Sequence, residues 1–187
     1  MAAGVLALQG SVNEHLSSLR RLGLEGVPVK TVPDLAAVDR LILPGGESTT
    51  LAGLLKEHGL AAAIRERARS GMPIWGTCAG MILLARRIVG QEEGGAIGVM
   101  DIAVRRNAYG AQIHSFRTEA PVAAFGAEPL PLVFIRAPYI VEAGPDVDIL
   151  FRLDGNIVAA RQGNLLATSF HPELTDDLRV HRYFLAM

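Results

Sequence analysis

The first half of the chain alternates short apolar runs with stretches in which apolar residues recur every three or four positions. The continuous runs predict buried strands, and the periodic stretches predict amphipathic helices. Strands are expected at residues 5–8, 27–32, 40–43 and 73–75, and helices at residues 12–22, 61–69 and 79–89. Strands and helices that alternate at such short spacing indicate a parallel sheet with helices on both faces.

Local signals mark where two helices begin. Ser11 and Glu14 have the spacing of a capping box, in which the serine oxygen accepts a backbone N–H and the glutamate reaches back. Ser48 precedes Leu51 and Leu55 and is expected to cap a further helix, which follows the strand at residues 40–43. Both helices then start directly after a strand, as an α/β fold requires.

The second half of the chain changes character. Its apolar stretches are separated by turns, and Gly155 and Gly163 each lie in a short polar turn that predicts a hairpin. A closing helix is expected over residues 176–187. Strands are expected at residues 99–105, 132–136, 147–153, 157–161 and 165–169. The prediction is therefore one domain over residues 1–187, an α/β fold of three layers. Its open, mostly parallel sheet is flanked by helices and has antiparallel strands in the C-terminal half.

Composition narrows the classes of function. The 187 residues suit one domain with a sizeable core. The formal net charge is −1 and no run of Lys or Arg stands out, which disfavours binding to nucleic acid or to a membrane surface. No apolar stretch reaches the length needed to cross a bilayer. The single cysteine, Cys78, excludes an internal disulfide and fits a reducing, cytoplasmic setting.

Cys78 lies at the centre of the sequence Gly-Thr-Cys-Ala-Gly, between an expected strand and an expected helix. This is the cysteine form of the nucleophile elbow, a tight turn in which glycines let the backbone pass close to its neighbours. The sulfur would project from the carboxyl end of the strand, and the helix N-terminus behind it favours a thiolate. Tight packing alone also selects glycine, but the strand–turn–helix context favours a nucleophile.

A candidate base and a candidate orienting group follow the last expected strand. In extended backbone, residues two apart point to the same side, so His171 and Glu173 are expected to converge while Pro172 stiffens the link. A carboxylate on the far imidazole N–H fixes the tautomer and stabilises the imidazolium. A strand-end histidine beside a capping glutamate is the alternative. With the elbow, the pair predicts a Cys78–His171–Glu173 triad.

The remaining histidines lack such a context. His15, His58 and His181 lie in expected helices, where surface or boundary positions are expected. His114 follows an expected loop and cannot be assigned a role. No cluster of Cys and His residues has the spacing of metal ligands, so no metal site is expected.

Two glycines after the third strand predict an oxyanion hole. Gly45 and Gly46 can let a backbone N–H point into the site, where negative charge develops during acyl transfer. The N–H groups of Gly46 and Ala79 are the candidate donors. Alternatively, Gly45 and Gly46 only allow the loop to adopt positive φ. A Walker-type phosphate-binding loop is disfavoured because the lysine of that motif is missing.

Two arginines also stand out, since each follows an apolar strand. Arg106 and Arg136 have the placement of a fork for a carboxylate or phosphate. A structural salt bridge would place an arginine in the same way, and the sequence leaves both interpretations open.

Together these motifs resemble the class I, triad-type glutamine amidotransferases. The elbow and the Phe-His-Pro-Glu stretch at residues 170–173 are specific only to that superfamily. The Pro-Gly-Gly-Glu-Ser-Thr-Thr stretch at residues 44–50 is more specific and resembles the glutaminase subunits of pyridoxal 5′-phosphate synthases. Many class I amidotransferases have Gln at the position of Ile82. The presence of Ile82 in this chain resembles the vitamin B6 branch instead. Further similar stretches are residues 8–10, 14–15, 106–107, 134–138 and 169–175, so the resemblance spans nearly the whole chain.

The resemblance implies a class I glutamine amidotransferase-like, flavodoxin-like fold and specific roles. Cys78 would attack the carboxamide of L-glutamine and form a glutamyl thioester, His171 would relay protons and Glu173 would orient it. Gln9 and Gly10 would belong to an activation switch at a partner interface. The residues expected to contact glutamine are Gly46, Glu47, Ser48, Arg106, Ile135 and Arg136.

The resemblance also implies a partner. Ammonia would pass, without entering bulk solvent, to a separate barrel-shaped synthase subunit in a hetero-oligomeric complex. That subunit would build pyridoxal 5′-phosphate from a pentose phosphate and a triose phosphate, and this chain would need no cofactor. The isolated chain is expected to be poorly active until docking fixes the oxyanion loop.

Three other interpretations of the same residues remain. An amidotransferase of another pathway would keep the triad and change the partner, although the Glu-Ser-Thr-Thr stretch at residues 47–50 argues against it. A cysteine peptidase or glutamyl hydrolase would act on glutamyl peptides without any partner. A binding module that has lost its chemistry would be expected to lack an intact triad and to carry a thiol of ordinary pKa.

Overall fold

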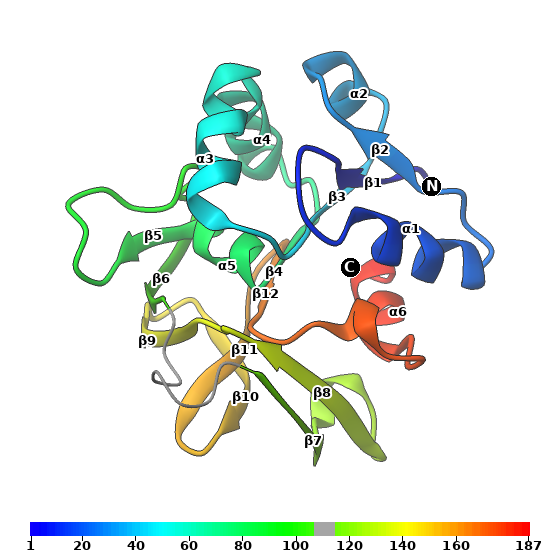
Figure 1. Ribbon diagram of the computed structural model, residues 1–187, viewed down its shortest axis with the longest axis vertical. Helices are drawn as coiled ribbons and strands as arrows, with labels where there is room; N and C mark the ends of the chain where they lie inside the picture. The colour runs from blue at the N-terminus through cyan, green and yellow to red at the C-terminus, as the bar shows by residue number, and fades with distance from the viewer. Residues whose placement is uncertain (107–114) are drawn as a thin grey trace.

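The computed structural model describes residues 1–106 and 115–187 (Figure 1). Within these residues, ten strands form a central sheet and two more form a separate hairpin. The central sheet has the order β2-β1-β3-β4-β12-β11-β9-β6-β5, with β10 paired to β11. The predicted α/β fold, mostly parallel in its first half and antiparallel in its C-terminal half, is confirmed.

The N-terminal half of the sheet is parallel throughout. Each of β1, β3 and β4 pairs in parallel with its neighbours, and β12, the last strand in the sequence, joins the far side of β4 in parallel. The carboxyl ends of these strands therefore meet at one edge of the sheet. Their bounds are β1 (Ala3–Leu6), β2 (Val27–Val29), β3 (Arg40–Leu43), β4 (Ile74–Thr77) and β12 (Leu165–Thr168).

The C-terminal half of the sheet is mainly antiparallel. Strand β11 pairs antiparallel with β12, β9 and β10, and β6 pairs antiparallel with β9. Both predicted hairpin turns are present, since Gly155 and Gly163 adopt positive φ of 83° and 56°. The bounds are β5 (Ala85–Ile88), β6 (Met100–Arg105), β9 (Tyr139–Ala143), β10 (Asp148–Leu153) and β11 (Asn156–Gln162).

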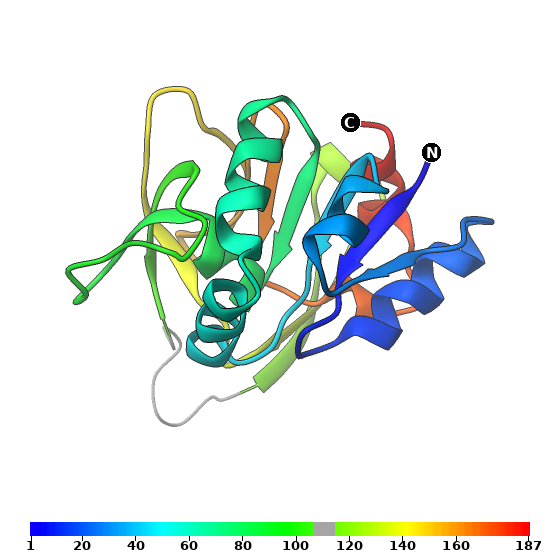
Figure 2. The same cartoon turned by 90° about the horizontal axis from the view of Figure 1, so that it is seen from above.

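Helices cover both faces of the sheet (Figures 1 and 2). One group packs into the cluster that contains Leu51 and Ile64, and the other packs into the cluster that contains Leu19 and Phe184. The first group is α2 (Val32–Ala36), α3 (Ser48–Glu57), α4 (Leu60–Arg69) and α5 (Ala79–Leu84), and the second is α1 (Val12–Arg21) and α6 (Arg179–Leu185).

The core lies on both sides of the sheet because strand side chains alternate between its faces. In β3, Leu41 and Leu43 join the first cluster, whereas Ile42 joins the second. In β4, Ile74 and Trp75 divide in the same way. The unbroken apolar runs in the sequence are therefore explained by burial on two sides.

The hairpin of β7 (Ser115–Pro121) and β8 (Pro129–Ile135) stands apart from the central sheet and corrects one expectation. The stretch at residues 132–136 was expected to extend the central sheet. Instead β8 pairs with β7 along its length, and its buried Leu130, Leu132 and Phe134 join the cluster under α1 and α6. The 3₁₀ turn η1 (Ala123–Phe125) connects the two strands.

Three further boundaries differ from the expected ones by three residues or more. The helix expected over residues 79–89 ends at Leu84, because residues 85–88 pair with β6 as strand β5. The strand expected over residues 27–32 ends at Val29, and the closing helix begins at Arg179 rather than at residue 176. Helix α2 was not expected, although Thr31 and Asp34 form a capping box that the sequence spacing shows.

The turn between β4 and α5 depends on two glycines. A Cβ on Gly80 would lie 2.1 Å from the backbone oxygen of Leu43 in β3, and a Cβ on Gly76 would lie 2.4 Å from the backbone of Gly80. Helix α5 can therefore start close against the sheet only because both positions lack a side chain. This explains the glycines that flank Cys78 in the sequence.

We expect Gly80→Ala to lower the free energy of unfolding by at least about 2 kcal/mol, because overpacking against backbone forces the helix away from the sheet. Gly53→Ala is the matched control. A Cβ on Gly53, in α3, meets no atom within 4 Å, and alanine favours helix, so stability should rise by up to about 1 kcal/mol. Urea denaturation measures both, and equal effects at the two positions would contradict this account of the turn.

Candidate active site

Cys78 occupies a strained turn at the carboxyl end of β4. Its φ is 49° and its ψ is −103°, a backbone conformation that residues other than glycine rarely adopt. The backbone N–H of Cys78 donates to the backbone oxygen of Thr168 at 2.8 Å, and this bond connects the turn to the end of β12. The side chain is mostly buried, and its sulfur lies 3.8 Å from the Ile135 oxygen.

His171 follows β12 and lies beside the thiol. The backbone N–H of His171 donates to the backbone oxygen of Val133 in β8 at 2.8 Å. A Cβ on Gly45 would lie 2.4 Å from His171 Cε1 and 3.5 Å from Cys78 Cβ. Both side chains therefore pack against the backbone of Gly45. Only glycine leaves room for the imidazole and the thiol at this point.

The environment of His171 favours the imidazolium. Burial alone would lower its pKa, but the neighbouring Cys78 sulfur and the Glu173 carboxylate raise the pKa to about 10. The ring Nδ1 lies 2.8 Å from Glu173 Oε1 and donates to it. The ring Nε2 is buried and has no hydrogen-bond partner among the described residues. That nitrogen is free to exchange a proton on the side where Cys78 lies.

Glu173 is a buried carboxylate that is kept ionised. Burial raises its pKa, but His15, His171 and Ser11 outweigh that effect and hold it at about 2. Ser11 Oγ donates to Oε1 at 2.7 Å, the same oxygen that accepts from His171. The backbone here is not extended as expected, because residues 172–174 form the 3₁₀ turn η2 (Pro172–Leu174). The turn still brings the two side chains together.

Two of the three histidines expected near the surface are buried. His15 in α1 and His181 in α6 have no exposed surface, and His15 Nδ1 lies 3.0 Å from His181 Nε2. His15 Nε2 lies 3.5 Å from Glu173 Oε2. His58 is exposed at the C-terminal end of α3, as expected.

The expected capping box at the start of α1 is also wrong. The helix begins after Ser11, but the Ser11 side chain makes no capping hydrogen bond. It donates to Glu173 instead, 162 positions away in the sequence. Likewise, Glu47 rather than Ser48 caps α3, with its carboxylate accepting the Thr50 N–H at 2.8 Å.

The loop that follows β3 is held by the loop that follows β1. Gly45 O accepts the Ser11 N–H at 3.0 Å, and Glu47 N–H donates to the Gln9 side-chain oxygen at 2.9 Å. A Cβ on Gly10, whose φ is 103°, would lie 1.8 Å from Gly45 O. The N–H groups of the two expected oxyanion donors, Gly46 and Ala79, donate to no acceptor within the described part of the chain.

One cavity of about 450 Å³ brings most of the expected residues together. Gln9 and Glu173 lie outside its lining, where Gln9 holds the loop at residues 45–47 and Glu173 holds His171. Asn107 and His114 lie outside the described residues. The cavity is lined by Gly10, Gly46, Glu47, Ser48, Cys78, Ala79, Arg106, Ile135, Arg136 and His171, together with Ser11, Gly45, Ile82, Pro138 and Leu174.

Several charged side chains line this cavity. Arg106 lies 3.5 Å from Glu47 Oε1 and 3.4 Å from Thr49 Oγ1, so the first of the two expected arginines pairs with another residue of the cavity lining. Arg136 is exposed and has a φ of 45°, and Ile135 beside it is 39% exposed. Apolar and charged groups therefore line the same small space.

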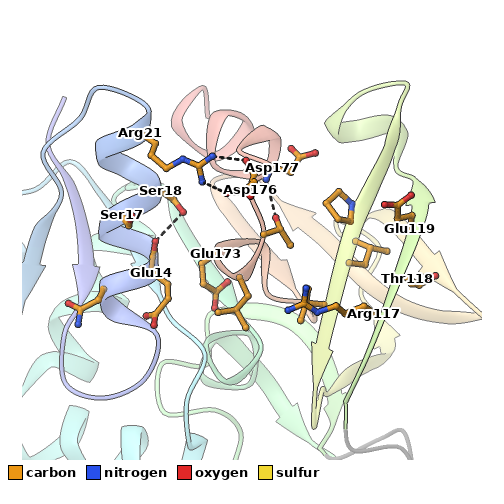
Figure 3. A pocket seen from close by; sticks show the side chains of 16 residues that line it. Glu14, Ser17, Ser18, Arg21, Arg117, Thr118, Glu119, Glu173, Asp176 and Asp177 are labelled. Carbon is orange, nitrogen blue, oxygen red and sulfur yellow. Dashed lines mark hydrogen bonds and ion pairs between the residues drawn. The ribbon is translucent and has the colours of Figure 1, made fainter.

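A second, larger hollow of about 1060 Å³ lies between α1 and the β7–β8 hairpin (Figure 3). Figure 3 shows Glu173 between these two walls, with Arg21 paired to Asp176 across the upper part. Its lining combines side chains of both charges with apolar ones such as Leu132 and Val133. In the described residues there is no group of three or more potential metal ligands and no helix long and apolar enough to cross a membrane.

The sequence comparisons agree with this geometry. The profile of the SNO glutamine amidotransferase family matches residues 5–187. The chain belongs to this family. A PdxT protein of Roseiflexus sp. (strain RS-1), named pyridoxal 5′-phosphate synthase subunit PdxT, is 54% identical to this SNO-family chain over 189 residues and 100% of both chains. The Clostridium botulinum (strain Loch Maree / Type A3) protein of the same name is 55% identical over 97% of this chain and 94% of its own.

Solved structures extend the similarity. A crystal structure of a glutamine amidotransferase superposes with a TM-score of 0.94 at 46% identity, covering 100% of this SNO-family chain and 98% of the other. The structure of PurLQS from Thermotoga maritima superposes with a TM-score of 0.70 at 18% identity, covering 99% and 97% of the two chains. At that identity the likeness concerns the fold alone.

Three residues at the site carry contacts that the motifs did not predict. Ser11 and His15 both contact Glu173, and Gly45 supports the thiol and the imidazole. A signal for His15 exists in the sequence. It lies between Val12 and Leu19 at helical spacing, on the apolar face of α1, which marks it as a buried histidine.

The pKa of Glu173 predicts how stability depends on pH. Its folded-state pKa of about 2 lies below the ordinary 4.5, so ionised Glu173 stabilises the fold above pH 4.5, and this contribution is lost as the pH falls toward 2. We expect the free energy of unfolding of the wild type to exceed that of Glu173→Gln by about 3 kcal/mol at most near neutral pH, and the gap to narrow in acid.

Urea denaturation from about pH 6 to about pH 3 measures this gap. Ser11→Ala removes one of the donors that lower the pKa of Glu173, so it should show the same trend with a smaller amplitude. A gap between wild type and Glu173→Gln that stays constant across this range would contradict the assignment of an ionised, donor-held carboxylate.

Proposed function

We propose that this chain is the glutaminase subunit of a pyridoxal 5′-phosphate synthase and hydrolyses L-glutamine to L-glutamate and ammonia. The observation that carries the proposal is the meeting of Cys78, His171 and a buried, ionised Glu173 beside one small cavity. Family membership and relatives named pyridoxal 5′-phosphate synthase subunit PdxT support the pathway.

The reaction begins with attack of the Cys78 thiolate on the carboxamide carbon of glutamine. The oxygen of that group gains negative charge, which the N–H groups of Gly46 and Ala79 stabilise. His171 gives its proton to the departing nitrogen, so that ammonia leaves and a glutamyl thioester remains. His171 then takes a proton from water, which attacks the thioester and releases glutamate and the thiolate. Glu173 keeps the imidazole in its working tautomer throughout.

The charged residues of the cavity fit the two ends of an amino acid. Glu47 and Arg106 already form a pair at 3.5 Å, and both are free to exchange that contact for the ammonium and carboxylate of glutamine. Ser48, Ile135 and Arg136 line the same cavity and complete the binding surface. The carboxamide then extends toward Cys78.

Ammonia produced here passes directly to a barrel-shaped synthase subunit, which uses it to build pyridoxal 5′-phosphate. The chain itself uses no cofactor. We further propose that docking activates the subunit by adjusting the loop at residues 45–47. Gln9 and Ser11 hold this loop from the adjacent loop after β1, so contact with residues 9–11 is transmitted to the loop that carries the Gly46 N–H.

Release of ammonia and glutamate from glutamine tests the proposal. We expect a low rate for the chain alone, a rate at least about tenfold higher when the synthase subunit is added, and no release by Cys78→Ala. Equal rates with and without the synthase would support the glutaminase activity but contradict the assignment to pyridoxal 5′-phosphate synthesis. Partner-independent hydrolysis of glutamyl peptides would favour a glutamyl hydrolase, and no release in any mixture would favour a binding module.

Arg106→Gln tests the binding of the substrate. We expect KM for glutamine to rise about tenfold while kcat changes less than about threefold, because the guanidinium binds the substrate and its transition state equally. Arg105→Gln is the matched control, since Arg105 is the exposed neighbour that does not line the cavity. Steady-state kinetics of the complex with the synthase measure both, and an unchanged KM in Arg106→Gln would remove this residue from the binding site.

A further inference from the structure

Two buried histidines take no part in the reaction described above. His15 and His181 come from α1 and α6, have no exposed surface and face each other at 3.0 Å. A buried polar group without partners costs free energy, so a pair of imidazoles in an apolar cluster demands an explanation. Packing alone would be served as well by leucine or phenylalanine.

The outer nitrogen of His15 faces the triad. His15 Nε2 lies 3.5 Å from Glu173 Oε2 and 3.4 Å from Thr77 Oγ1. The other carboxylate oxygen, Oε1, is occupied by short contacts from His171 and Ser11. Oε2 has no hydrogen bond of normal length within the described residues, so the His15 contact is the interaction available to it there.

The direction of the protons follows from these contacts. When His181 Nε2–H donates to His15 Nδ1, the remaining proton of His15 is on Nε2 and points at Glu173. The opposite arrangement would set a lone pair of His15 against the carboxylate and leave His181 Nδ1–H buried without an acceptor. The first arrangement leaves only an acceptor nitrogen of His181 unpaired, so the contacts favour it.

Both imidazoles are neutral near neutral pH. Burial lowers the pKa of His15, against the opposing effects of Glu173 and Glu14, and His171 lowers it further. Burial and the neighbouring His15 lower the pKa of His181 to about 3. The pair therefore acts through the direction of its N–H groups rather than through a net charge.

We propose that His15 is a positioning residue of the triad, whose Nε2–H holds Oε2 of Glu173 so that Oε1 stays aligned with His171. His181 sets the tautomer of His15, and Ser11 completes the support from the same end of α1. The inference rests on the proposed glutaminase activity and deepens it. At 3.5 Å the contact is long for a hydrogen bond, and such contacts often tighten when the substrate complex forms.

A matched pair of variants separates positioning from packing. His15→Gln places an amide N–H near the position of Nε2 and keeps a donor for Glu173. His15→Asn places its amide near the position of Nδ1, so it keeps a partner for His181 and loses the donor for Glu173. Both variants lose the edge contact that the imidazole makes with the Trp75 ring, whose centroid is 5.5 Å away.

Steady-state ammonia release by the complex with the synthase is the first measurement. We expect kcat of His15→Asn to fall about tenfold to a hundredfold, the loss typical when a group that orients an active-site residue is removed, with KM for glutamine within about twofold of wild type. His15→Gln should retain kcat within about threefold. Thermal denaturation should show similar losses of stability for the two variants.

Alkylation of Cys78 by iodoacetamide is the second measurement and needs neither glutamine nor a partner. Because the chain has one cysteine, the rate reports this thiol alone. We expect the alkylation rates to follow the order of kcat: fastest in the wild type, slower in His15→Gln and slowest in His15→Asn. If kcat and alkylation follow stability instead, or if His15→Asn outperforms His15→Gln, the inference is overturned. A wild type that releases no ammonia would overturn the proposed function, while the alkylation order would still decide the role of His15.

Discussion

The parallel pairing of β4 with β12 is the constraint on which the site depends. The two strands come from distant parts of the sequence, and their register places Thr77 opposite Thr168. Each strand is followed by a functional segment, so Cys78 and His171 emerge at the same edge of the sheet. The hydrogen bond from Cys78 N–H to Thr168 O fixes the last step of this alignment, and the bond from Trp75 Nε1 to Thr168 Oγ1 supports it from the core.

The second requirement is a buried negative charge. Glu173 has no exposed side-chain surface, and an isolated carboxylate in that position would take up a proton. Ser11 and His171 satisfy Oε1, and the imidazolium of His171 balances the charge. The attraction between these two groups contributes to both the pKa of about 2 for Glu173 and the pKa of about 10 for His171. Carboxylate and imidazolium are thus each stable in the core because the other is present.

The sequence predicted those parts of the molecule whose signals are local. The nucleophile elbow at Cys78, the glycine turns and the parallel strands all follow from short patterns, and the structure contains them. The contact partners of Ser11 and His15 could not be read in the same way. Their contacts join α1 to residues more than a hundred positions away, and the serine spacing matched a helix cap equally well.

The wrong boundaries have a related cause. Residues 79–84 are buried on every side, so the apolar run shows no period that would separate the end of helix α5 from the start of β5. Within the described residues, β7 and β8 pair only with each other, and the alternating exposed positions of β7 gave no apolar run to detect. Tertiary pairing, rather than local preference, decided these elements.

The segment from Gln9 to His15 links the two halves of the chemistry. Gln9 and the Ser11 N–H hold the loop that carries Gly46, the proposed oxyanion donor, while the Ser11 hydroxyl and His15 contact Glu173. One short segment therefore contacts both the loop of the proposed oxyanion donor and the carboxylate proposed to orient His171. A synthase subunit that docks against this segment, as proposed above, would act on both at once, because Ser11 contacts the loop through its backbone N–H and Glu173 through its hydroxyl. Under the proposed activation, docking would raise the activity by bringing this segment into its working position, which moves the Gly46 loop and Glu173 together.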